Sequence, residues 1–435
     1  MLRVSENHRY LVHDDGSPFF YLGDTAWELF HRLDRRGADR YLEHRAAQGF
    51  TVIQAVVLGE LKGLKEPNAN GDLPFVDRDI ARPNEAYFAH VDYIVDKAAS
   101  SGLHIGMLPT WGSHVGVNWE GSAGKHFIDA YNARGYGRFL GRRYGAKPII
   151  WILGGDRPAE GNEEVWGELA AGLRDGDGGR CLMTYHPPGS ASSSDHLGEA
   201  AWLDFNMIQS GHSMNRTNFS AIGRCYRLSP VRPCMDAEPT YEYPPNDMPE
   251  GLPVDAYQVR LGAYWGLFAG SFGHTYGTHP IWQMYAPPHE PKWNVHTCWY
   301  DAMDLPGALQ MKHVKALMLS RPFLTRIPDP SLIRSGMGWV LDHVQAARDG
   351  TPKVCDATYI MAYFPQPRRV LLNGARIAGD RLRVWWFDPR SGQARDMGQV
   401  ANQGIMEFGP PSQTPKEDWV LVIDDVRCNY GPPGT

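Results

Sequence analysis

The stretch Lys147-Pro-Ile-Ile-Trp-Ile-Leu-Gly-Gly-Asp156 is a short apolar run that ends abruptly in a carboxylate. The stretch Pro233-Cys-Met-Asp-Ala-Glu-Pro239 has the same design, with Asp236 and Glu238 at its end. Short apolar runs bounded by turn residues are typical of parallel strands that are buried on both faces. Because the carboxyl ends of parallel strands meet at one edge of a sheet, we expect these acids to lie on a common rim.

Six further apolar runs share this design, which brings the number of predicted strands to eight. The eight runs cover residues 19–23, 51–58, 104–109, 148–153, 181–185, 205–208, 231–235 and 271–276. Between most of them lie amphipathic stretches, such as 38–48 and 85–101, whose apolar residues are three and four apart and predict helices. Eight strands that alternate with helices over roughly 300 residues predict a (β/α)8 TIM barrel.

A doubly wound α/β sheet is the alternative arrangement of strands and helices. Such a sheet usually has fewer strands and carries a glycine-rich turn that binds phosphate after its first strand. No GxGxxG motif follows the first predicted strand of this chain. The sequence therefore favours the barrel, and we assign the protein to the α/β class on that basis.

Both ends of the chain add elements to the predicted barrel. Tyr10-Leu-Val-His-Asp-Asp-Gly-Ser17 places an Asp-Gly turn between two apolar runs, which predicts a hairpin covering the N-terminal face of the barrel. The Pro-rich segment 321–330 predicts a domain boundary. Beyond it, runs at 358–364, 368–372, 382–387 and 419–423 predict a small antiparallel β-sandwich. We expect a barrel domain over residues 1–325 and an accessory sandwich over 326–435.

Composition and charge exclude several classes of protein. The chain has 435 residues, 43% of them hydrophobic and 21% charged, which is typical of a globular protein of two or three domains. A net charge of −6 provides no basic surface for nucleic acid, and no apolar run approaches the ~20 residues that cross a bilayer. The six cysteines show no CxxC spacing, so we expect reduced thiols. The first residues contain no signal-peptide core, so the sequence as written predicts a cytoplasmic protein, or a secreted or periplasmic one if its N-terminus was trimmed.

The residues that follow the predicted strands decide the chemistry, because barrel enzymes carry their active sites at this end. They are rich in aromatic, amide and imidazole groups, which suit a neutral, polyhydroxylated small molecule or oligosaccharide. Only Arg157 stands close enough to the centre to suit a phosphate. The predicted ligand-binding residues are Asp24, Trp27, Gln54, Trp111, Tyr185, His186, Gln209, His212, Tyr276, His279 and Trp282.

Two acids on this rim, Asp156 and Glu238, are the predicted catalytic pair. A pair of carboxylates can supply the general acid and the nucleophile that cleave a glycosidic bond. Asp156 follows two glycines that permit a tight turn, although an N-cap of the next helix is an alternative role. Because side chains alternate along a strand, Asp236 and Glu238 should share a face. We expect Glu238, nearer the strand end, to react and Asp236 to hydrogen-bond inside the barrel; a structural ion pair is the alternative role of Glu238.

Histidines and serines near the rim raise two other enzymatic hypotheses. Four histidines near strand ends, His186, His212, His274 and His279, are compatible with a metal-dependent hydrolase. An HxH pair on the first strand and an HExxH motif are both missing, so neutral histidines that bind sugar hydroxyls are the favoured interpretation. A serine esterase is disfavoured because no GxSxG motif occurs, and segment 190–194 predicts a flexible loop. We therefore expect neither a metal nor a cofactor.

Seven blocks of the chain, in order, resemble the apiosidase-like glycoside hydrolases of family 140. The blocks are Gly23-Asp-Thr-Ala-Trp-Glu-Leu-Phe30, Met107-Leu-Pro-Thr-Trp-Gly112, Trp151-Ile-Leu-Gly-Gly-Asp-Arg157, Met183-Thr-Tyr-His-Pro187, Trp202-Leu-Asp-Phe-Asn-Met-Ile-Gln-Ser-Gly-His212, Asp236-Ala-Glu-Pro-Thr-Tyr-Glu242 and Phe272-Gly-His-Thr-Tyr-Gly277. The C-terminal segment resembles the small β-sandwich, sometimes labelled collagen-binding, that accompanies this family. That segment shows nothing specific to collagen, and we expect it to support the barrel.

The resemblance implies a retaining, exo-acting glycosidase that works by double displacement. It implies that Asp156 is the acid/base and Glu238 the nucleophile, the same two positions that the strand ends indicate. Asp156 would then need a pKa raised by burial and by the charge of Glu238. The family's known substrates contain β-linked apiose, so the resemblance implies release of terminal apiose from plant glycosides or pectin-derived oligosaccharides.

Three alternatives to this function stay open at the level of sequence. A retaining glycosidase for another pentose, an arabinofuranoside or a xyloside, would share the fold, because fold alone does not decide the sugar. A non-catalytic carbohydrate-binding barrel would bind glycosides without hydrolysing them. A metal-dependent hydrolase would lose its activity to chelators, a loss that we do not expect.

Overall fold

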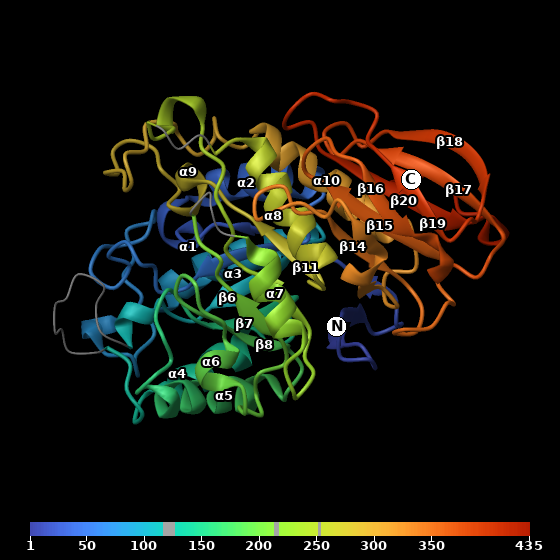
Figure 1. The fold of residues 1–435 in the computed structure, drawn as a ribbon. Coiled ribbons are helices and arrows are strands. Elements are labelled where there is room, and N and C mark those ends of the chain that lie inside the picture. Colours follow the sequence, from blue (N-terminus) through green and yellow to red (C-terminus); the bar gives the residue numbers. More distant parts are fainter. Residues whose placement is uncertain (116–126, 213–216, 251–253) are drawn as a thin grey trace.

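Eight parallel strands form the centre of the larger lobe of the molecule (Figure 1). The computed structural model describes residues 1–115, 127–212, 217–250 and 254–435. In spatial order the strands are β8 (Met183–His186), β7 (Ile149–Gly154), β6 (His104–Leu108), β5 (Val52–Val56), β4 (Tyr21–Thr25), β11 (Gly273–Tyr276), β10 (Cys234–Asp236) and β9 (Asn206–Ile208). Each overlaps one of the eight predicted runs, so the predicted barrel is confirmed.

Helices surround this sheet and connect its strands. They are α1 (Leu29–Arg32), α2 (Arg35–Ala47), α3 (Glu85–Ser100), α4 (Ala133–Tyr144), α5 (Glu163–Asp177), α6 (Ser194–Leu197), α7 (Asn218–Tyr226), α8 (Ala256–Phe268), α9 (His279–Trp282) and α10 (Pro306–Leu319). The helices α2 and α3 lie where the apolar spacing predicts them. The inner and outer faces of the strands are both covered, which explains why the strands are nearly continuous apolar runs.

The barrel is closed differently between β8 and β9 than elsewhere. In the described part of the chain, ladder hydrogen bonds join the other neighbouring strands but not this pair. Side chains bridge the seam instead: Thr184 Oγ1 donates to Phe205 O at 2.6 Å, and Asp204 Oδ2 accepts from Met183 N at 2.7 Å. The seam therefore stays joined with little strand pairing, and the two strands that follow Asp156 in the chain order meet there.

A small antiparallel sheet lies at the N-terminal end of the barrel. It consists of β1 (Leu2–Val4), β2 (Leu11–His13) and β3 (Pro18–Phe19). The predicted hairpin is confirmed as β2 and β3, joined by a turn in which Gly16 has a φ of 82°. Phe19 packs against His104, the first residue of β6, with ring centroids 5.0 Å apart. The N-terminal sheet thus covers the end of the barrel opposite the predicted catalytic rim.

The C-terminal part of the chain forms the two sheets of a β-sandwich. The larger sheet contains β12 (Ile327–Pro328), β14 (Gln345–Arg348), β15 (Tyr359–Phe364), β20 (Trp419–Asp425), β17 (Arg381–Phe387) and β18 (Ala394–Ala401). The smaller sheet contains β13 (Ile333–Ser335), β16 (Val370–Asn373) and β19 (Ile405–Phe408). The sequence did not predict β12, β13, β14, β18 and β19. Of these, β18 and β19 are mostly exposed, and their polar residues hide the alternating pattern of a strand.

The larger sheet of the sandwich is buried on both faces. Along β15, Ile360, Ala362 and Phe364 enter the core between the two sheets, whereas Tyr359, Met361 and Tyr363 belong to the hydrophobic core of the barrel. Tyr363 stacks on Tyr264 of α8 with ring centroids 4.9 Å apart. Because residues of both lobes form one continuous core, the sandwich closes a side of the barrel that would otherwise be apolar and exposed (Figure 1).

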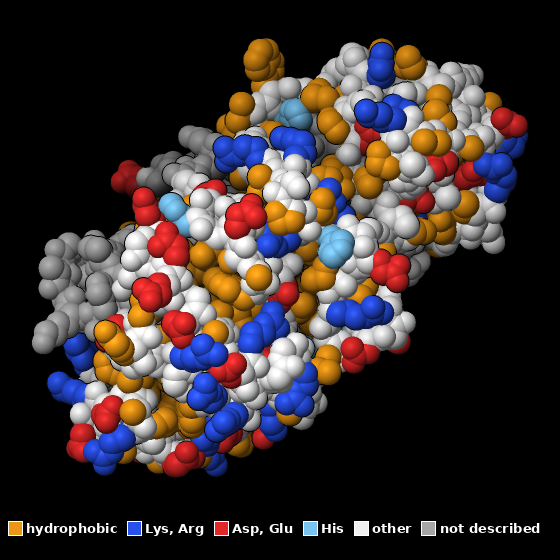
Figure 2. Space-filling view, turned by 90° about the horizontal axis from the view of Figure 1, so that it is seen from below, with side chains coloured by type: hydrophobic (Ala, Val, Ile, Leu, Met, Phe, Trp, Pro, Cys, Tyr) orange, Lys and Arg blue, Asp and Glu red, His pale blue; other side chains and the backbone are white. Residues whose placement is uncertain are grey.

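The surface gives no indication of a membrane or nucleic-acid partner on the face that can be inspected. On the face shown in Figure 2, Lys and Arg side chains alternate with Asp and Glu side chains rather than forming a field of one sign. Among the described residues, no helix combines the length and the apolar character needed to traverse a bilayer. The C-terminal rim of the barrel is therefore the place to look for chemistry.

Candidate active site

Asp156 follows β7 on a sharply turned loop. Gly154 and Gly155 have φ values of 91° and 113°, which glycine adopts readily. A Cβ at Gly155 would lie 2.7 Å from the ring of Trp111, so the glycine lets the chain pass directly over the indole. Asp156 itself has a left-handed φ of 52°, a conformation that Asp tolerates better than most residues and that is common at functional sites. Since α5 begins only at Glu163, the alternative role of Asp156 as its N-cap is wrong.

Glu238 lies two residues beyond the end of β10, where the chain has left the strand. Asp236, the last residue of β10, faces the helix layer instead of the barrel interior. Its carboxylate accepts hydrogen bonds from Ser210 Oγ at 2.7 Å and from Asn218 Nδ2 of α7 at 3.0 Å. The prediction that the two acids share a face, with Asp236 inside the barrel, is therefore wrong because the strand alternation stops at Asp236.

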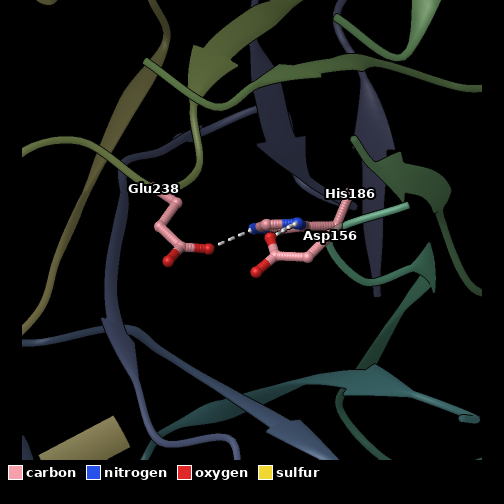
Figure 3. A group of neighbouring side chains, drawn as sticks. All are labelled: Asp156, His186 and Glu238. Carbon is pink, nitrogen blue, oxygen red and sulfur yellow. Dashed lines mark ion pairs between the residues drawn. The ribbon is translucent and has the colours of Figure 1, made fainter. Parts of the chain in front are cut away.

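His186, the last residue of β8, lies between the two predicted catalytic acids (Figure 3). Its Nε2 is 3.1 Å from Oε2 of Glu238, and its Nδ1 is 3.9 Å from Oδ1 of Asp156. Burial lowers the pKa of His186, but the hydrogen bond and charge of Glu238, with the charge of Asp156, outweigh burial and raise it. The imidazole therefore tends to carry a proton and links the two acids into one electrostatic unit.

The second oxygen of Glu238 also has two partners. Oε1 accepts a hydrogen bond from the hydroxyl of Tyr241 at 2.8 Å and lies 3.2 Å from Nε2 of His212. Burial would raise the pKa of Glu238, but the hydrogen bonds and positive charge of His186 and His212 outweigh it and hold the pKa well below its usual range. Glu238 is thus an ionised, firmly oriented carboxylate, which is the state that a nucleophile needs.

The pKa of Asp156 is shifted in the opposite direction. Burial and the negative charge of Glu238 raise it to about 6, against the opposing charges of His186 and His212 and a hydrogen bond from Gln209. Its side chain keeps an exposed fraction of 26%, compared with 4% for Glu238. Two carboxyl groups whose pKa values are pushed apart in one site are the usual arrangement of an acid and a nucleophile.

Two tryptophans form an aromatic wall next to the acids. The rings of Trp27 and Trp111 have centroids 5.5 Å apart, and Trp27 meets the imidazole of His186 edge-on at 5.3 Å. Both indoles are almost fully buried, and the Nε1 of Trp111 has no hydrogen-bond partner among the described residues. The wall fixes the plane of His186 and leaves an indole N–H donor available near Asp156.

A second group of rings extends outward from Glu238 on the other side. The ring of His212 lies 4.0 Å from that of Tyr241, and His279 follows at 5.5 Å from His212. Trp282 Nε1 donates to Nδ1 of His279, so the opposite nitrogen donates to the hydroxyl of Tyr243 at 3.0 Å. Burial lowers the pKa of His279 to about 3, which makes it a neutral imidazole. The outer wall is therefore aromatic and uncharged, as a sugar site requires.

Comparison with known proteins identifies the fold family. A model of the apiosidase-like catalytic domain matches residues 5–325. The chain belongs to the apiosidase-like family. It is an enzyme of the glycoside hydrolase class. A second model, described as "Putative collagen-binding domain of a collagenase", matches residues 327–424 of this apiosidase-like protein.

Solved structures agree with the family assignment. A structure named glycoside hydrolase is 34% identical, with 98% of this chain and 97% of that chain covered and a TM-score of 0.88. A glycoside hydrolase family 5 protein from Bacteroides vulgatus is 32% identical, with 99% and 95% covered and a TM-score of 0.89. A family 5 mannosidase from Rhizomucor miehei, at 12% identity with 70% and 94% covered and a TM-score of 0.51, shares the fold alone. Comparison with curated protein sequences gives no match.

Two of the predicted ligand-binding residues of this apiosidase-like protein, Asp24 and Tyr276, face the helix layer. Asp24 Oδ2 accepts from Arg45 Nε at 2.6 Å and from the hydroxyl of Tyr41 at 2.5 Å, both on α2. The hydroxyl of Tyr276 donates to Oε2 of Glu242 at 2.7 Å. The predicted contact of Asp24 and Tyr276 with a ligand is therefore wrong. In a strand that is buried on both faces, the residue pattern does not reveal which side chains point inward.

Tyr185 and Gln54 are also occupied away from the ligand space. Tyr185 packs edge-on against Trp166 of α5, and its hydroxyl donates to the carbonyl of Arg157 at 2.8 Å. Gln54 is fully buried inside the barrel, and its Nε2 donates to the carbonyl of Ala237 at 3.2 Å. Their predicted ligand contacts are wrong. Instead, each holds the backbone of a residue adjacent to one of the two acids.

Two residues of the site escaped the sequence analysis, Tyr241 and Glu60. Tyr241 lies three residues after Glu238, within one of the quoted blocks, but nothing marked its hydroxyl as a partner of the carboxylate. Glu60 lies on the loop beyond β5, and its pKa is raised to about 8 by burial and by the charges of Asp156 and Glu28. An acid beyond the end of a barrel strand was the available signal for Glu60, and the distance from the strand end concealed it.

The three residues at the centre also meet the distance criterion for a metal site. Asp156, His186 and Glu238 each offer one ligand atom, and these atoms lie within 4.8 Å of one another. Two carboxylates and an imidazole suit several divalent metals. However, a metal ligand must be unprotonated, whereas the environment raises the pKa of His186 and favours its protonated form. The geometry thus favours a hydrogen-bonded acid pair over a metal centre.

Proposed function

We propose that this enzyme is a retaining, exo-acting glycosidase that releases a terminal β-linked apiose. The observation that carries the proposal is the pair of carboxylates with opposite pKa shifts, joined by His186 and with oxygens within 4.8 Å of each other. Retaining enzymes place their two carboxyl groups about 5–5.5 Å apart, whereas inverting enzymes leave about 6.5–9.5 Å for a water molecule. The short separation supports the retaining mechanism.

In the first step, Glu238 attacks the anomeric carbon while Asp156 gives its proton to the departing glycosidic oxygen. The carbon–oxygen bond to the leaving group breaks, and an ester bond between Glu238 and the sugar forms. In the second step, Asp156 takes a proton from water, and the resulting hydroxide displaces Glu238 from the anomeric carbon. Tyr241 and His212 hold Glu238 in place throughout, and His186 offsets the change in charge between the two acids.

The remaining rim residues are proposed to contact the sugar. Indole faces and uncharged donors suit the C–H faces and hydroxyls of a neutral pentose. These residues are Trp27, Trp111, Gln209, His212, His279 and Trp282, with His186 beneath them. The specific sugar is an inference from the family, whose name refers to apiose, and is open to direct test.

The sugar preference can be measured with four aryl glycosides that carry the same leaving group. We expect kcat/KM to be highest for the β-apioside and roughly 10-fold or more lower for the arabinofuranoside, xyloside and glucoside, because a missing or misplaced group in a fitted site costs about 1–3 kcal/mol. Initial rates with each substrate supply the comparison, and rates with and without a chelator test the metal hypothesis.

Each alternative function gives a different result in this experiment. Faster turnover of another pentoside would replace apiose as the substrate while keeping the mechanism. Binding of the glycosides by calorimetry without turnover of any of them would indicate a carbohydrate-binding protein. Loss of activity in the chelator, restored by a divalent metal, would indicate a metal-dependent hydrolase.

The shifted pKa of Asp156 predicts the pH dependence of the reaction. The acid must be protonated in the first step, so kcat/KM should fall as the pH rises through about 6, the pKa of Asp156. The acidic limb lies at low pH because the pKa of Glu238 is held well below its usual range. A pH profile of kcat/KM with a slow aryl glycoside measures both limbs.

The matched variants for this profile are Asp156→Ala and Glu160→Ala. Glu160 is an exposed carboxylate on the same loop, so Glu160→Ala should keep the wild-type profile. Asp156→Ala should lose the alkaline limb with a substrate whose leaving group needs no proton. An alkaline limb that survives in Asp156→Ala would assign the proton donation to another group.

We also propose that the chain divides after residue 325 into a catalytic unit and an accessory unit. The accessory sandwich supports the barrel mechanically rather than binding a partner of its own. This role is supported by the common core of the two lobes and by the buried Arg321–Asp424 ion pair, whose atoms lie 2.7 Å apart. The Arg260–Asp418 pair makes the same kind of link from α8 to β20, at 2.7 Å.

A further inference from the structure

A groove lies on the side of the barrel next to the proposed active site. It has a volume of about 680 Å³ and lies between the loop before α6, the end of β9 and the helix α7. This volume falls within the roughly 300–1,000 Å³ that is typical of sites for small organic ligands. Its polar lining residues are Ser190, Ser192, Ser194, Asp195, Gln209, Ser210, Thr217, Asn218, Ser220 and Arg224.

Gln209 connects the groove to the acid/base. It lines the groove, and its side chain hydrogen-bonds Asp156, which lowers the pKa of that carboxyl against the larger effect of burial. Its Oε1 is buried without a partner among the described residues and lies 3.9 Å from where a Cβ of Gly189 would be. Gly189 precedes Ser190, the first residue of the groove. One amide therefore reaches from the proton donor to the groove.

The position of the groove indicates which part of a substrate it would hold. An acid/base donates its proton to the glycosidic oxygen, so the leaving group must lie on the side of Asp156. Glu238, the partner of the sugar that is released, lies on the opposite side of His186. A leaving group that extends past Asp156 and Gln209 would enter the groove.

The lining of the groove indicates the chemical class of that leaving group. Hydroxyl and amide groups dominate it, with small apolar patches at Ile208, Ala221 and Leu228. One acidic and one basic side chain, Asp195 and Arg224, balance each other at exposed positions. The described lining contains no aromatic ring on which a flat aromatic aglycone would stack. This combination suits a chain of neutral sugars.

We propose that the groove is a leaving-group subsite that binds an oligosaccharide of neutral sugars, so that the enzyme removes a terminal pentose from an oligosaccharide rather than from an aromatic glycoside. The proposal rests on the proposed function, since it needs Asp156 as the acid/base. It adds the substrate class, because it makes affinity depend on sugar units beyond the bond that is cleaved. Gln209 then positions Asp156 according to the occupancy of the groove.

The test blocks the groove with a large side chain. Ala221→Trp places an indole on the face of α7 that lines the groove, and Ser220→Trp does so from an exposed position if the first variant folds poorly. Arg227→Trp, at the exposed end of the same helix and outside the lining, is the matched control. The substrates are 4-nitrophenyl β-apioside and a trisaccharide in which apiose is β-linked to cellobiose.

We expect the wild type to show a KM at least about 10-fold lower for the trisaccharide than for the aryl apioside, because ordered contacts with each added sugar contribute about 1–3 kcal/mol. Ala221→Trp or Ser220→Trp should remove this difference by raising the KM of the trisaccharide, with kcat/KM for the aryl apioside within about 2-fold of the wild type. Arg227→Trp should leave both substrates unchanged. Equal KM values in the wild type, or an unchanged trisaccharide KM in both blocking variants, would overturn the proposal.

A binding measurement separates failure of the groove from failure of the proposed function. Cellobiose alone, titrated into the wild type by calorimetry, should bind in the groove, and Ala221→Trp should abolish this binding while Glu238→Ala keeps it. Absence of cellobiose binding to the wild type overturns the subsite. Absence of turnover of the aryl apioside, with cellobiose binding intact, overturns the proposed glycone instead. A flavonoid apioside that is bound more tightly than the trisaccharide would favour an aromatic leaving group.

Discussion

Replacing Glu238 by Ala is expected to reduce kcat by about 10⁴- to 10⁶-fold, the range in which removal of a member of a covalent catalytic set falls. The variant should fold, because the side chain removed makes hydrogen bonds only within the site, to His186, His212 and Tyr241. Burst-free initial rates with an aryl β-apioside and a thermal unfolding curve measure the two effects separately. Activity within about 10-fold of the wild type would exclude Glu238 as the nucleophile.

Two further variants make this expectation specific to the mechanism. Azide should restore part of the activity of both Glu238→Ala and Asp156→Ala, because a small nucleophile can use the space that either deletion opens. In a double displacement, Glu238→Ala should give the glycosyl azide of inverted configuration, and Asp156→Ala the azide of retained configuration. The same product configuration from both variants would contradict the assigned roles.

Asp236→Asn is the contrasting control, since Asp236 stands two residues before Glu238. Its carboxylate bonds Ser210 and Asn218 and faces the helix layer. The substitution should lower the midpoint of thermal unfolding while leaving the chemical step close to that of the wild type. A large loss in kcat with unchanged stability would move Asp236 back into the reacting group.

The sequence was sufficient for the barrel and for the two acids, because both depend on features that survive in any local context. Apolar runs of strand length in alternation with helices require a parallel sheet, and an acid at the end of such a run must lie on its rim. Asp156 and Glu238 were found in this way. The double glycine before Asp156 marked the turn, and the structure shows why: a Cβ at Gly155 would collide with Trp111.

The orientation of individual side chains could not be predicted with the same success. Asp24, Tyr185 and Tyr276 lie on strands covered on both faces, where inward and outward residues are equally apolar in their surroundings and polar ones can pair with the helices. Arg45, which binds Asp24, comes from a helix that the sequence gives no reason to connect with that strand. Tyr241 and Glu60 lie on loops, whose path depends on packing that no periodicity describes.

The sandwich is expected to be indispensable for the folded barrel. A chain that ends at residue 325 should be insoluble, because the barrel would lose the side chains that cover α8. These side chains are Ala347, Tyr359, Met361, Tyr363, Trp385, Phe387, Val420 and Val422. Each large apolar side chain that is fully buried contributes about 1.5–3 kcal/mol, so their joint loss exceeds the usual net stability of about 5–15 kcal/mol that a domain possesses. Expression of residues 1–325, followed by sedimentation and an activity assay, tests this expectation; a soluble and active fragment would refute it.

A single substitution tests the same contact without the ambiguity of a truncated chain. Asp418 pairs with Arg260 of α8 at 2.7 Å, and both side chains are almost fully buried, so Asp418→Ala leaves an uncompensated charge between the lobes. Breaking a buried pair in this way typically costs about 3–5 kcal/mol. Glu407→Ala is the control, because its partner Arg369 is largely exposed and such surface pairs contribute about 0–1 kcal/mol. If chemical denaturation shows one cooperative transition that Asp418→Ala shifts and Glu407→Ala does not, the two lobes unfold as one unit; two separate transitions would mean that the barrel is stable without its sandwich.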